Sequence, residues 1–107
     1  MKRISIVVLF ILSMNILCAQ SKIFNIDGVY YDVKGTIFSG YHKEFYDNDT
    51  LMLEMPVQEG LLEGQVIYYY RNGQMKELRT YTNGIINGVW MQWDEAGNKT
   101  AEANYLM

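Results

Sequence analysis

Apolar and polar residues alternate along the middle of the chain with a period of two. In residues 50–57 every second position is apolar, namely Leu51, Leu53, Met55 and Val57. Successive side chains of a β-strand point to opposite faces, whereas a helix would repeat every 3.6 residues. The pattern therefore predicts a strand with one buried face and one face that is at least partly solvated.

The sequence also repeats itself every 24 residues. Tandem repeats of this length are typical of arrays in which each repeat is one supersecondary unit packed against its neighbours. We therefore place three units at residues 40–63, 64–87 and 88–107. The shift brings three sets of residues into register: Gly40, Gly64 and Gly88; Asp49, Gly73 and Gly97; and Val57, Tyr81 and Tyr105.

Each unit is expected to form one β-hairpin. Opening strands are predicted at residues 41–46, 65–70 and 89–93, and returning strands at residues 50–57, 74–81 and 98–105. The reversals fall at residues 47–49, at Asn72-Gly73 and at residues 95–97. Asn72-Gly73 is the strongest signal, because a type I′ turn needs positive φ at both central residues and these two types tolerate it best.

Glycines bracket the links between the hairpins. Residues 60–64 and 84–88 both read G-x-x-x-G with two apolar residues inside. Glycine supplies backbone angles closed to other residues, so we expect a short reversal with the apolar pair tucked under the sheet. The structural glycines of the array are then Gly40, Gly60, Gly64, Gly73, Gly84, Gly88 and Gly97.

Two further features shape the expected sheet. Pro56 lies inside a returning strand, and proline cannot donate to a ladder, so a break or bulge is expected there.

Residues 20–34 precede the array as an N-terminal cap and first strand, with the strand at residues 29–33. Because a terminal repeat has no neighbour to cover it, the apolar residues of the lead-in are expected to pack onto the first hairpin. They are Ile23, Phe24 and Ile26. The repeat domain follows at residues 35–107.

Residues 1–19 have the layout of a secretory signal peptide. Two basic residues are followed by an almost continuous apolar stretch at residues 4–12 and by a region that ends at Ala19. The apolar stretch is short for a membrane span. We expect cleavage after Ala19 and export to the periplasm or cell envelope. An uncleaved anchor and lipidation at Cys18 are the alternatives, and the second is less favoured because a lipobox has a small residue where this chain has Leu17.

The charge and the cysteine content of the chain limit the classes of partner and exclude a disulfide. Of the nine Lys and Arg, two belong to the signal peptide, which leaves seven against twelve Asp and Glu and a net charge of −5 for the remaining chain. Nucleic-acid binding requires clustered basic residues, so no such partner is expected. Anionic lipid head groups fit poorly for the same reason, and we expect no membrane contact apart from the signal segment. The only cysteine, Cys18, leaves with that segment, so no disulfide is expected.

No residues form a recognisable catalytic or metal site. His42 is the only histidine and lies two positions before Glu44. Such a pair can act as a general base, but no nucleophile and no second histidine for a zinc triad accompany it. We therefore interpret His42 as a half-exposed strand residue. Residues 47–49 begin like a calcium loop but lack its central glycine and distal glutamate. We expect no enzyme activity, no metal and no cofactor.

Aromatic residues recur at related positions of successive hairpins. Strand alternation places Phe45, Tyr69 and Trp93 on one face, which we expect to be the core. The opposite face carries the candidate binding strip for a protein or a glycan: Tyr46, Tyr68, Tyr70 and Trp90. The last strand has no hairpin after it in this sequence, so its edge is expected to accept another strand, which predicts self-association.

Taken together, these residues resemble the MORN repeat, and more closely its variant in bacterial proteins labelled YwqK-type antitoxins. The resemblance covers about residues 35–105 and is strongest in the second unit. It implies antiparallel hairpins laid side by side into an elongated, twisted, single-layer sheet. It also implies a non-enzymatic protein-interaction module, here expected at the cell envelope. The alternative is an antitoxin or immunity protein, and export argues against a cytoplasmic toxin as its target. The matching residues are Gly64, Tyr69, Asn72, Gly73, Tyr81, Asn83, Gly84 and Gly88, followed in the third unit by Trp90, Trp93, Gly97 and Tyr105.

Overall fold

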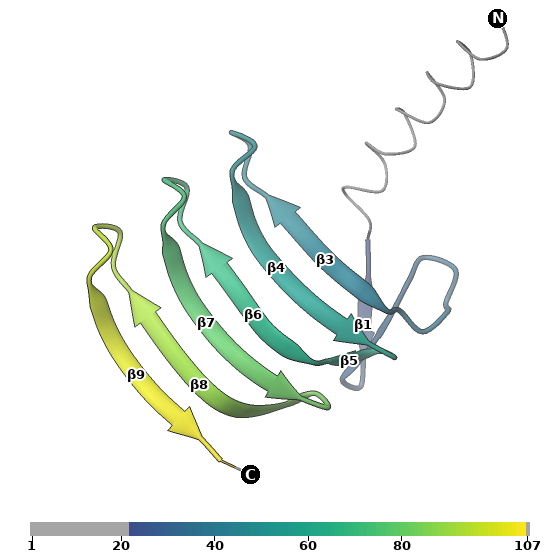
Figure 1. Ribbon diagram of the computed structural model, residues 1–107. Coiled ribbons are helices and arrows are strands. Elements are labelled where there is room, and N and C mark those ends of the chain that lie inside the picture. The colour runs from purple at the N-terminus through teal and green to yellow at the C-terminus, as the bar shows by residue number, and fades with distance from the viewer. Residues whose placement is uncertain (1–21, 107) are drawn as a thin grey trace, which may run out of the picture.

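The computed structural model describes residues 22–106, and in this range the chain consists of strands and turns (Figure 1). The predicted signal peptide, with Cys18 and the cleavage site after Ala19, lies outside the described residues. Among residues 22–106 no helix is long and apolar enough to cross a membrane. The expected all-β class is confirmed.

Within residues 22–106, nine strands form two antiparallel sheets. A small sheet pairs β1 (Phe24–Ile26) with β2 (Val29–Tyr31). In the large sheet the order is β3-β4-β6-β7-β8-β9, with the short β5 beside β4. Its hairpins β3–β4, β6–β7 and β8–β9 lie side by side with their turns at the same end, as the 24-residue period requires (Figure 1). The bounds are β3 Gly40–Phe45, β4 Leu51–Gln58, β5 Leu61–Leu62, β6 Gly64–Tyr69, β7 Met75–Thr82, β8 Ile85–Trp93 and β9 Lys99–Tyr105.

The prediction of a type I′ turn at Asn72-Gly73 is wrong. Only Gly73 has positive φ there, at 90°. The amide of Gly73 donates to the carbonyl of Tyr70 at 3.0 Å, and the amide of Tyr70 donates to the carbonyl of Gln74 at 2.8 Å. These two bonds close a three-residue loop, a type I turn followed by a left-handed residue. The same pair of bonds closes the loops of the other two hairpins, with Asp49 and Gly97 as the left-handed residues.

Two-residue turns with positive φ at both positions occur in the links instead. Asn83 and Gly84 have φ of 50° and 82°, and Glu59 and Gly60 have φ of 49° and 83°. The residues after each turn pair at once with the preceding strand, which makes β5 and the start of β8. The apolar pairs of the links are therefore strand residues. The expectation that they tuck under the sheet holds for Leu62, which packs against the core, and is wrong for Ile85, which is 54% exposed.

The break expected at Pro56 is present on one side of its strand. Toward β3 the ladder runs through Pro56 without a shift. On the other side, pairing with β6 stops at Glu54, and pairing resumes at Val57 with β5. One repeat later, the β7–β8 ladder shifts in register between Arg79 and Tyr81. The irregularity therefore belongs to the repeat. Proline fits at this position, where its carbonyl still accepts a hydrogen bond from the amide of Glu63 at 3.1 Å.

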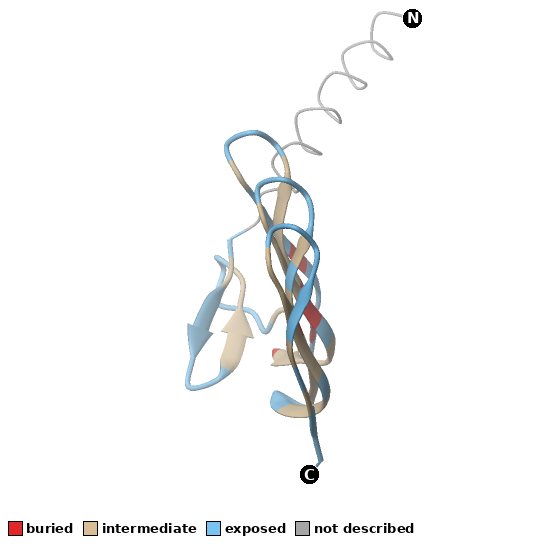
Figure 2. Cartoon of the chain, turned by 90° about the vertical axis from the view of Figure 1, so that its left-hand side faces the viewer, coloured by how far each residue is buried: buried red, intermediate tan, exposed pale blue. Residues whose placement is uncertain are grey.

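The core lies on one face of the large sheet, which we call the covered face. Its buried residues are Met55, Val57 and Val66, and Ile23, Tyr30, Phe38 and others pack against them. The β1–β2 hairpin stands on this side of the sheet (Figure 2). The cap expectation holds for Ile23, which packs against the core, and is wrong for Ile26, which is 57% exposed. Phe24 is 50% exposed but lines a cavity beside β3.

The core is on the face opposite to the predicted one. Strand alternation places Phe45, Tyr69 and Trp93 on the other side of the sheet, which we call the open face. Phe45 is 39% exposed there. Alternation groups residues by face but does not say which face a second layer will cover, and here the β1–β2 hairpin makes that choice.

Candidate binding faces of the sheet

A polar and aromatic cluster lies on the covered face at β6, β7 and β8. Register places Tyr68, Glu77 and Gln92 in one cross-strand row, and Arg79 beside Trp90 in the next. One carboxylate oxygen of Glu77 accepts hydrogen bonds from Arg79 Nε at 2.9 Å and from Trp90 Nε1 at 2.7 Å. The Arg79 guanidinium also lies 5.9 Å from the centre of the Tyr68 ring. We call these five residues the Glu77 cluster.

The hydrogen bonds of the Glu77 cluster decide its protonation. Burial by itself raises the pKa of Glu77, but the hydrogen bonds from Trp90 and Arg79 outweigh burial and hold the pKa below the ordinary value of 4.5. Hydrogen bonds with Tyr81 and Glu77 raise the pKa of Arg79 further above its ordinary range. The carboxylate and guanidinium are therefore both charged at neutral pH, in a fixed geometry.

Acid should weaken the fold through Glu77. Because its pKa is lower in the folded than in the unfolded state, its ionisation contributes stability above pH 4.5, and this contribution is lost as the pH falls through the folded pKa. In Glu77→Gln the contribution is absent at every pH. We expect the difference in unfolding free energy between the wild type and Glu77→Gln, measured by urea denaturation, to shrink between pH 6 and pH 3. A difference that stays constant over this range would contradict the assignment.

The predicted aromatic strip lies on the covered face, and each of its residues is half-buried. Tyr46 and Tyr70 join neighbouring hairpins, because their hydroxyls donate to the carbonyls of Tyr69 at 2.6 Å and Trp93 at 2.8 Å. Tyr68 packs against the core. Each of the three tyrosines has a cation over its ring: Arg71 over Tyr46, Lys76 over Tyr70 and Arg79 over Tyr68.

Glu77 and Arg79 are the residues that the sequence reasoning did not include in the strip. Their signal was present, because they occupy the positions that Leu53 and Met55 hold in the first repeat. A charged pair at apolar repeat positions indicates a local polar site within an otherwise apolar face. Pattern alone does not show that Trp90 donates to the same carboxylate.

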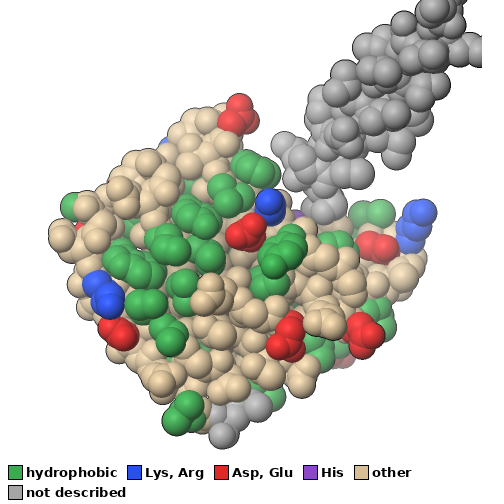
Figure 3. Space-filling model, viewed as in Figure 1, with side chains coloured by type: hydrophobic (Ala, Val, Ile, Leu, Met, Phe, Trp, Pro, Cys, Tyr) green, Lys and Arg blue, Asp and Glu red, His purple; other side chains and the backbone are tan. Residues whose placement is uncertain are grey.

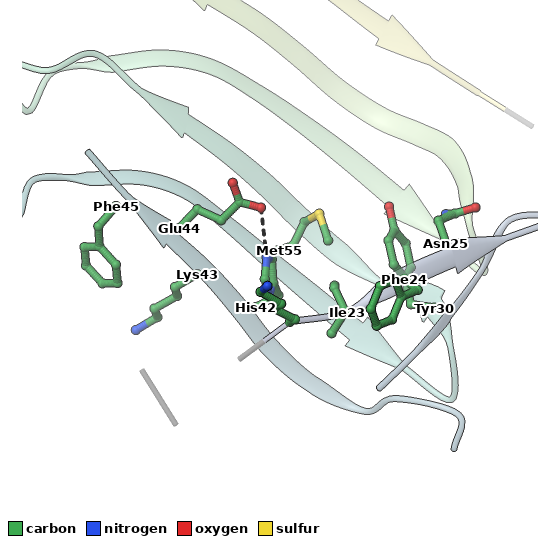
Figure 4. A pocket seen from close by; sticks show the side chains of 10 residues that line it. Ile23, Phe24, Asn25, Tyr30, His42, Lys43, Glu44, Phe45 and Met55 are labelled. Atoms are coloured by element: carbon green, nitrogen blue, oxygen red, sulfur yellow. Dashed lines mark hydrogen bonds and ion pairs between the residues drawn. The ribbon is translucent and has the colours of Figure 1, made fainter. Parts of the chain in front are cut away.

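A cavity of about 570 Å³ lies between the lead-in and β3 (Figure 4). His42 lines it and is only 6% exposed, so the expectation of a half-exposed histidine is wrong. Its Nε2 is 2.9 Å from a carboxylate oxygen of Glu44, and its Nδ1 is buried without a hydrogen-bond partner in the described structure. The cause is the lead-in, since Ile23 and Phe24 also line this cavity. Within residues 22–106 no group of three potential ligand side chains could hold a metal ion.

The open face carries an apolar row between charged ends. Register aligns Ile67, Leu78 and Met91 across β6, β7 and β8, and Leu78 is 6% exposed. Glu54 continues the row on β4 and Glu102 on β9. Each glutamate pairs with a lysine: Lys43 at 3.6 Å from Glu54, and Lys99 at 2.9 Å from Glu102. Figure 3 shows hydrophobic side chains gathered over the middle strands of this face.

The two ends of the large sheet are β3 and β9. No described strand pairs with the outer side of β9. Addition of another strand at this edge, which the sequence analysis expected, stays a prediction.

The fold and these two faces define the class of protein: tandem β-hairpin repeats that together form one open sheet. Comparison with protein families agrees at one place: residues 62–83 match the model of the MORN repeat variant. The match covers the whole second hairpin, β6 and β7, where the resemblance in the sequence was also strongest. A repeat of this kind supports a protein-interaction module in general. No curated protein and no solved structure matches the chain.

Proposed function

We propose that this protein is an exported, non-enzymatic interaction module of the cell envelope that binds a protein partner through the aromatic strip and the Glu77 cluster. The observation that supports the proposal is the grouping of Tyr68, Arg79 and Trp90 around one carboxylate. Tyrosine, tryptophan and arginine are the residues that most often dominate the binding energy of protein interfaces.

The geometry also favours binding by lowering its entropic cost. Arg79 and Trp90 are held by hydrogen bonds to the same oxygen of Glu77, so they lose little side-chain freedom when a partner docks. The Arg79 side chain remains 39% exposed, and the cation–π contact holds it over Tyr68. The β1–β2 hairpin packs on the core residues of β4 and β6, which leaves the β7–β8 part of the face for a partner.

Affinity capture tests the proposal. The tagged protein is used to retain partners, which are identified by mass spectrometry, and the affinity of the main partner is then measured for the double variant Arg79→Ala, Trp90→Ala. Loss of two anchors is expected to weaken binding by at least about 30-fold, the equivalent of about 2 kcal/mol. The matched control is Val89→Ala, which changes the residue that precedes Trp90 in the same strand and lies on the open face. Equal affinities for the double variant and the control, both folded by circular dichroism, would overturn the proposal.

An antitoxin or immunity role is the second candidate, and it rests on the sequence resemblance to the bacterial repeat variant. It uses the same surface and differs only in the partner, which would then be a toxin acting outside the cytoplasm. A toxin encoded beside this protein and recovered in the same capture experiment would support it.

A further inference from the structure

We propose that the outer edge of β3 is a docking site for a β-hairpin of another protein, which takes the place of a preceding repeat. The loop of this partner hairpin carries a tyrosine, a basic residue and an asparagine, in this order. The inference does not rest on the proposed function, because β4 and β6 separate β3 from the strands that carry Arg79 and Trp90.

Neighbouring hairpins of the array are joined by the same contacts twice. At the end of the sheet that carries the three-residue loops, which we call the loop end, a tyrosine hydroxyl and an asparagine amide of one hairpin donate to two backbone carbonyls of the next. The hydroxyls of Tyr46 and Tyr70 donate to the carbonyls of Tyr69 at 2.6 Å and Trp93 at 2.8 Å. The side-chain amides of Asn48 and Asn72 donate to the carbonyls of Arg71 at 3.4 Å and Glu95 at 3.0 Å.

The first hairpin has the acceptors of this interface but receives no donors. A shift of 24 residues makes the carbonyls of Phe45 and Asp47 the equivalent acceptors. The amide of Tyr46 donates to Thr50 on the β4 side, so strand alternation directs the backbone groups of Phe45 to the outer edge. Among residues 22–106 no strand pairs with this edge, and no side chain donates to either carbonyl.

At the opposite end of the hairpins, the chain supplies the preceding unit itself. The amide of Gly84 donates to the carbonyl of Leu62 in the preceding link at 2.8 Å. One repeat earlier, the amide of Gly60 donates to the carbonyl of Phe38 at the same distance. Phe38 therefore stands where the link of a preceding hairpin would be. The lead-in replaces only this end of the missing unit, and the loop end is left to another chain.

The edge of β3 is hollow on the side of the missing unit. The cavity of about 570 Å³ lies here, and Lys43 and Glu44 of β3 line it (Figure 4). These two residues are the equivalents of Ile67 and Tyr68, through which β6 pairs with β4. A strand that enters the cavity therefore meets the two positions that join hairpins elsewhere in the sheet, and it can add to β3 through main-chain hydrogen bonds.

The charge of the partner loop follows from Asp47. The middle residues of the three loops alternate in charge, in the order Asp47, Arg71 and Glu95. Arg71 pairs with Asp47 across two hairpins. A basic residue on the other side of Asp47 continues this alternation. Together with the two donors, the partner loop then has the residue types of Tyr70, Arg71 and Asn72.

A second copy of this chain does not fit the site. Its third hairpin is the one that no described strand covers on the outer side. In the loop of that hairpin Asp94 and Ala96 replace the tyrosine and the asparagine, and neither side chain donates a hydrogen bond at neutral pH. The Asp94 carboxylate already accepts from the amides of Ala96 and Asn98. Glu95 would also meet Asp47, a like charge. The partner is therefore a different protein.

A cyclic peptide of residues 66–79 tests the proposal, because it is the loop-end half of the second hairpin. Val66 pairs with Arg79, so the ends can be joined through a two-residue turn that keeps the peptide folded. The control peptide carries Tyr70→Phe and Asn72→Ala, which remove the two donors; alanine is also the residue at this place in the third loop. We expect the first peptide to bind the full chain at least about tenfold more tightly than the control, as measured by fluorescence anisotropy.

Lys43→Pro tests the edge of β3 on the protein side. Alternation directs the amide of Lys43 outward, like that of Phe45, so proline removes an edge donor without removing a bond to β4. We expect this variant to bind the first peptide at least about tenfold more weakly than the wild type. The matched control is Lys43→Ala, which loses the same ion pair with Glu54 but keeps the amide. It is expected to bind like the wild type.

Three results would overturn the proposal. They are a full chain that binds neither peptide, equal binding of the two peptides, and equal binding by Lys43→Pro and Lys43→Ala when circular dichroism shows both to be folded. If Lys43→Pro does not fold, the comparison of the two peptides decides. The double variant Arg79→Ala, Trp90→Ala is expected to keep its affinity for the first peptide, which separates this site from the surface of the proposed function.

Discussion

Replacing Gly60 by alanine is expected to lower the unfolding free energy by about 3 kcal/mol, which follows from left-handed strain of about 1–2 kcal/mol together with overpacking of 1–3 kcal/mol. Gly60 is buried at φ 83° in the turn between β4 and β5. A Cβ there would lie 2.6 Å from Cγ1 of Val29 and 3.1 Å from Cγ2 of Ile37. The same residue joins the layers, because its amide donates to Phe38 and its carbonyl accepts from Tyr30, each at 2.8 Å. Urea denaturation measures the loss.

Gly73→Ala is the matched control. Gly73 has a similar φ of 90°, but nothing lies within 4 Å of the position of its Cβ. This variant therefore carries only the conformational strain, and we expect a loss of about 1 kcal/mol. The difference between the two variants isolates the contact of Gly60 with the β1–β2 hairpin and the residues that follow it. Equal losses would contradict the packing of these residues against the turn.

The periodic features of the fold could be predicted from the sequence because they depend on local geometry. The 24-residue shift and strand alternation located all three hairpins to within a few residues, with β8 the largest difference. β8 begins at Ile85 rather than at residue 89 because Asn83-Gly84 makes a two-residue turn and the apolar residues after it join the strand.

Turn type depended on information that the dipeptide does not contain. Asn-Gly suits both central positions of a type I′ turn, but it also suits the last two positions of a three-residue loop. At Asn72 the side-chain oxygen accepts from the amide of Gln74 at 2.9 Å, and the asparagine keeps negative φ. The backbone pairing of Tyr70 with Gln74 decides between the two turns, and this pairing is a property of the hairpin.

The sequence predicted part of the candidate site, because strand alternation groups residues by face but does not say which face will be covered. Alternation placed Tyr68 and Trp90 together on one face, and both belong to the Glu77 cluster there. It could not place the β1–β2 hairpin, which is the only described second layer and decides which face contains the core. A short lead-in can fold over either side of a sheet. Tertiary packing therefore decides which face is covered, and the two-residue alternation of the strands does not.

Val66→Asp is expected to abolish folding and is the most direct test of which face is covered. Val66 is 2% exposed in the core with Met55 and Val57. An aspartate at this position would be a buried polar or charged group without a partner, and this costs several kcal/mol, which is comparable to the whole stability of a small domain. Far-ultraviolet circular dichroism and thermal unfolding measure the result, and we expect no cooperative transition for the variant.

Gln65→Asp is the control, since Gln65 is the preceding residue of the same strand and is exposed on the open face. Its loss is expected to stay below about 1 kcal/mol, the full range of strand propensities. If Val66→Asp folded as well as this control, the core would not lie on the covered face. The position of the Glu77 cluster would then be incorrect as well, because the cluster is defined by its side of the sheet.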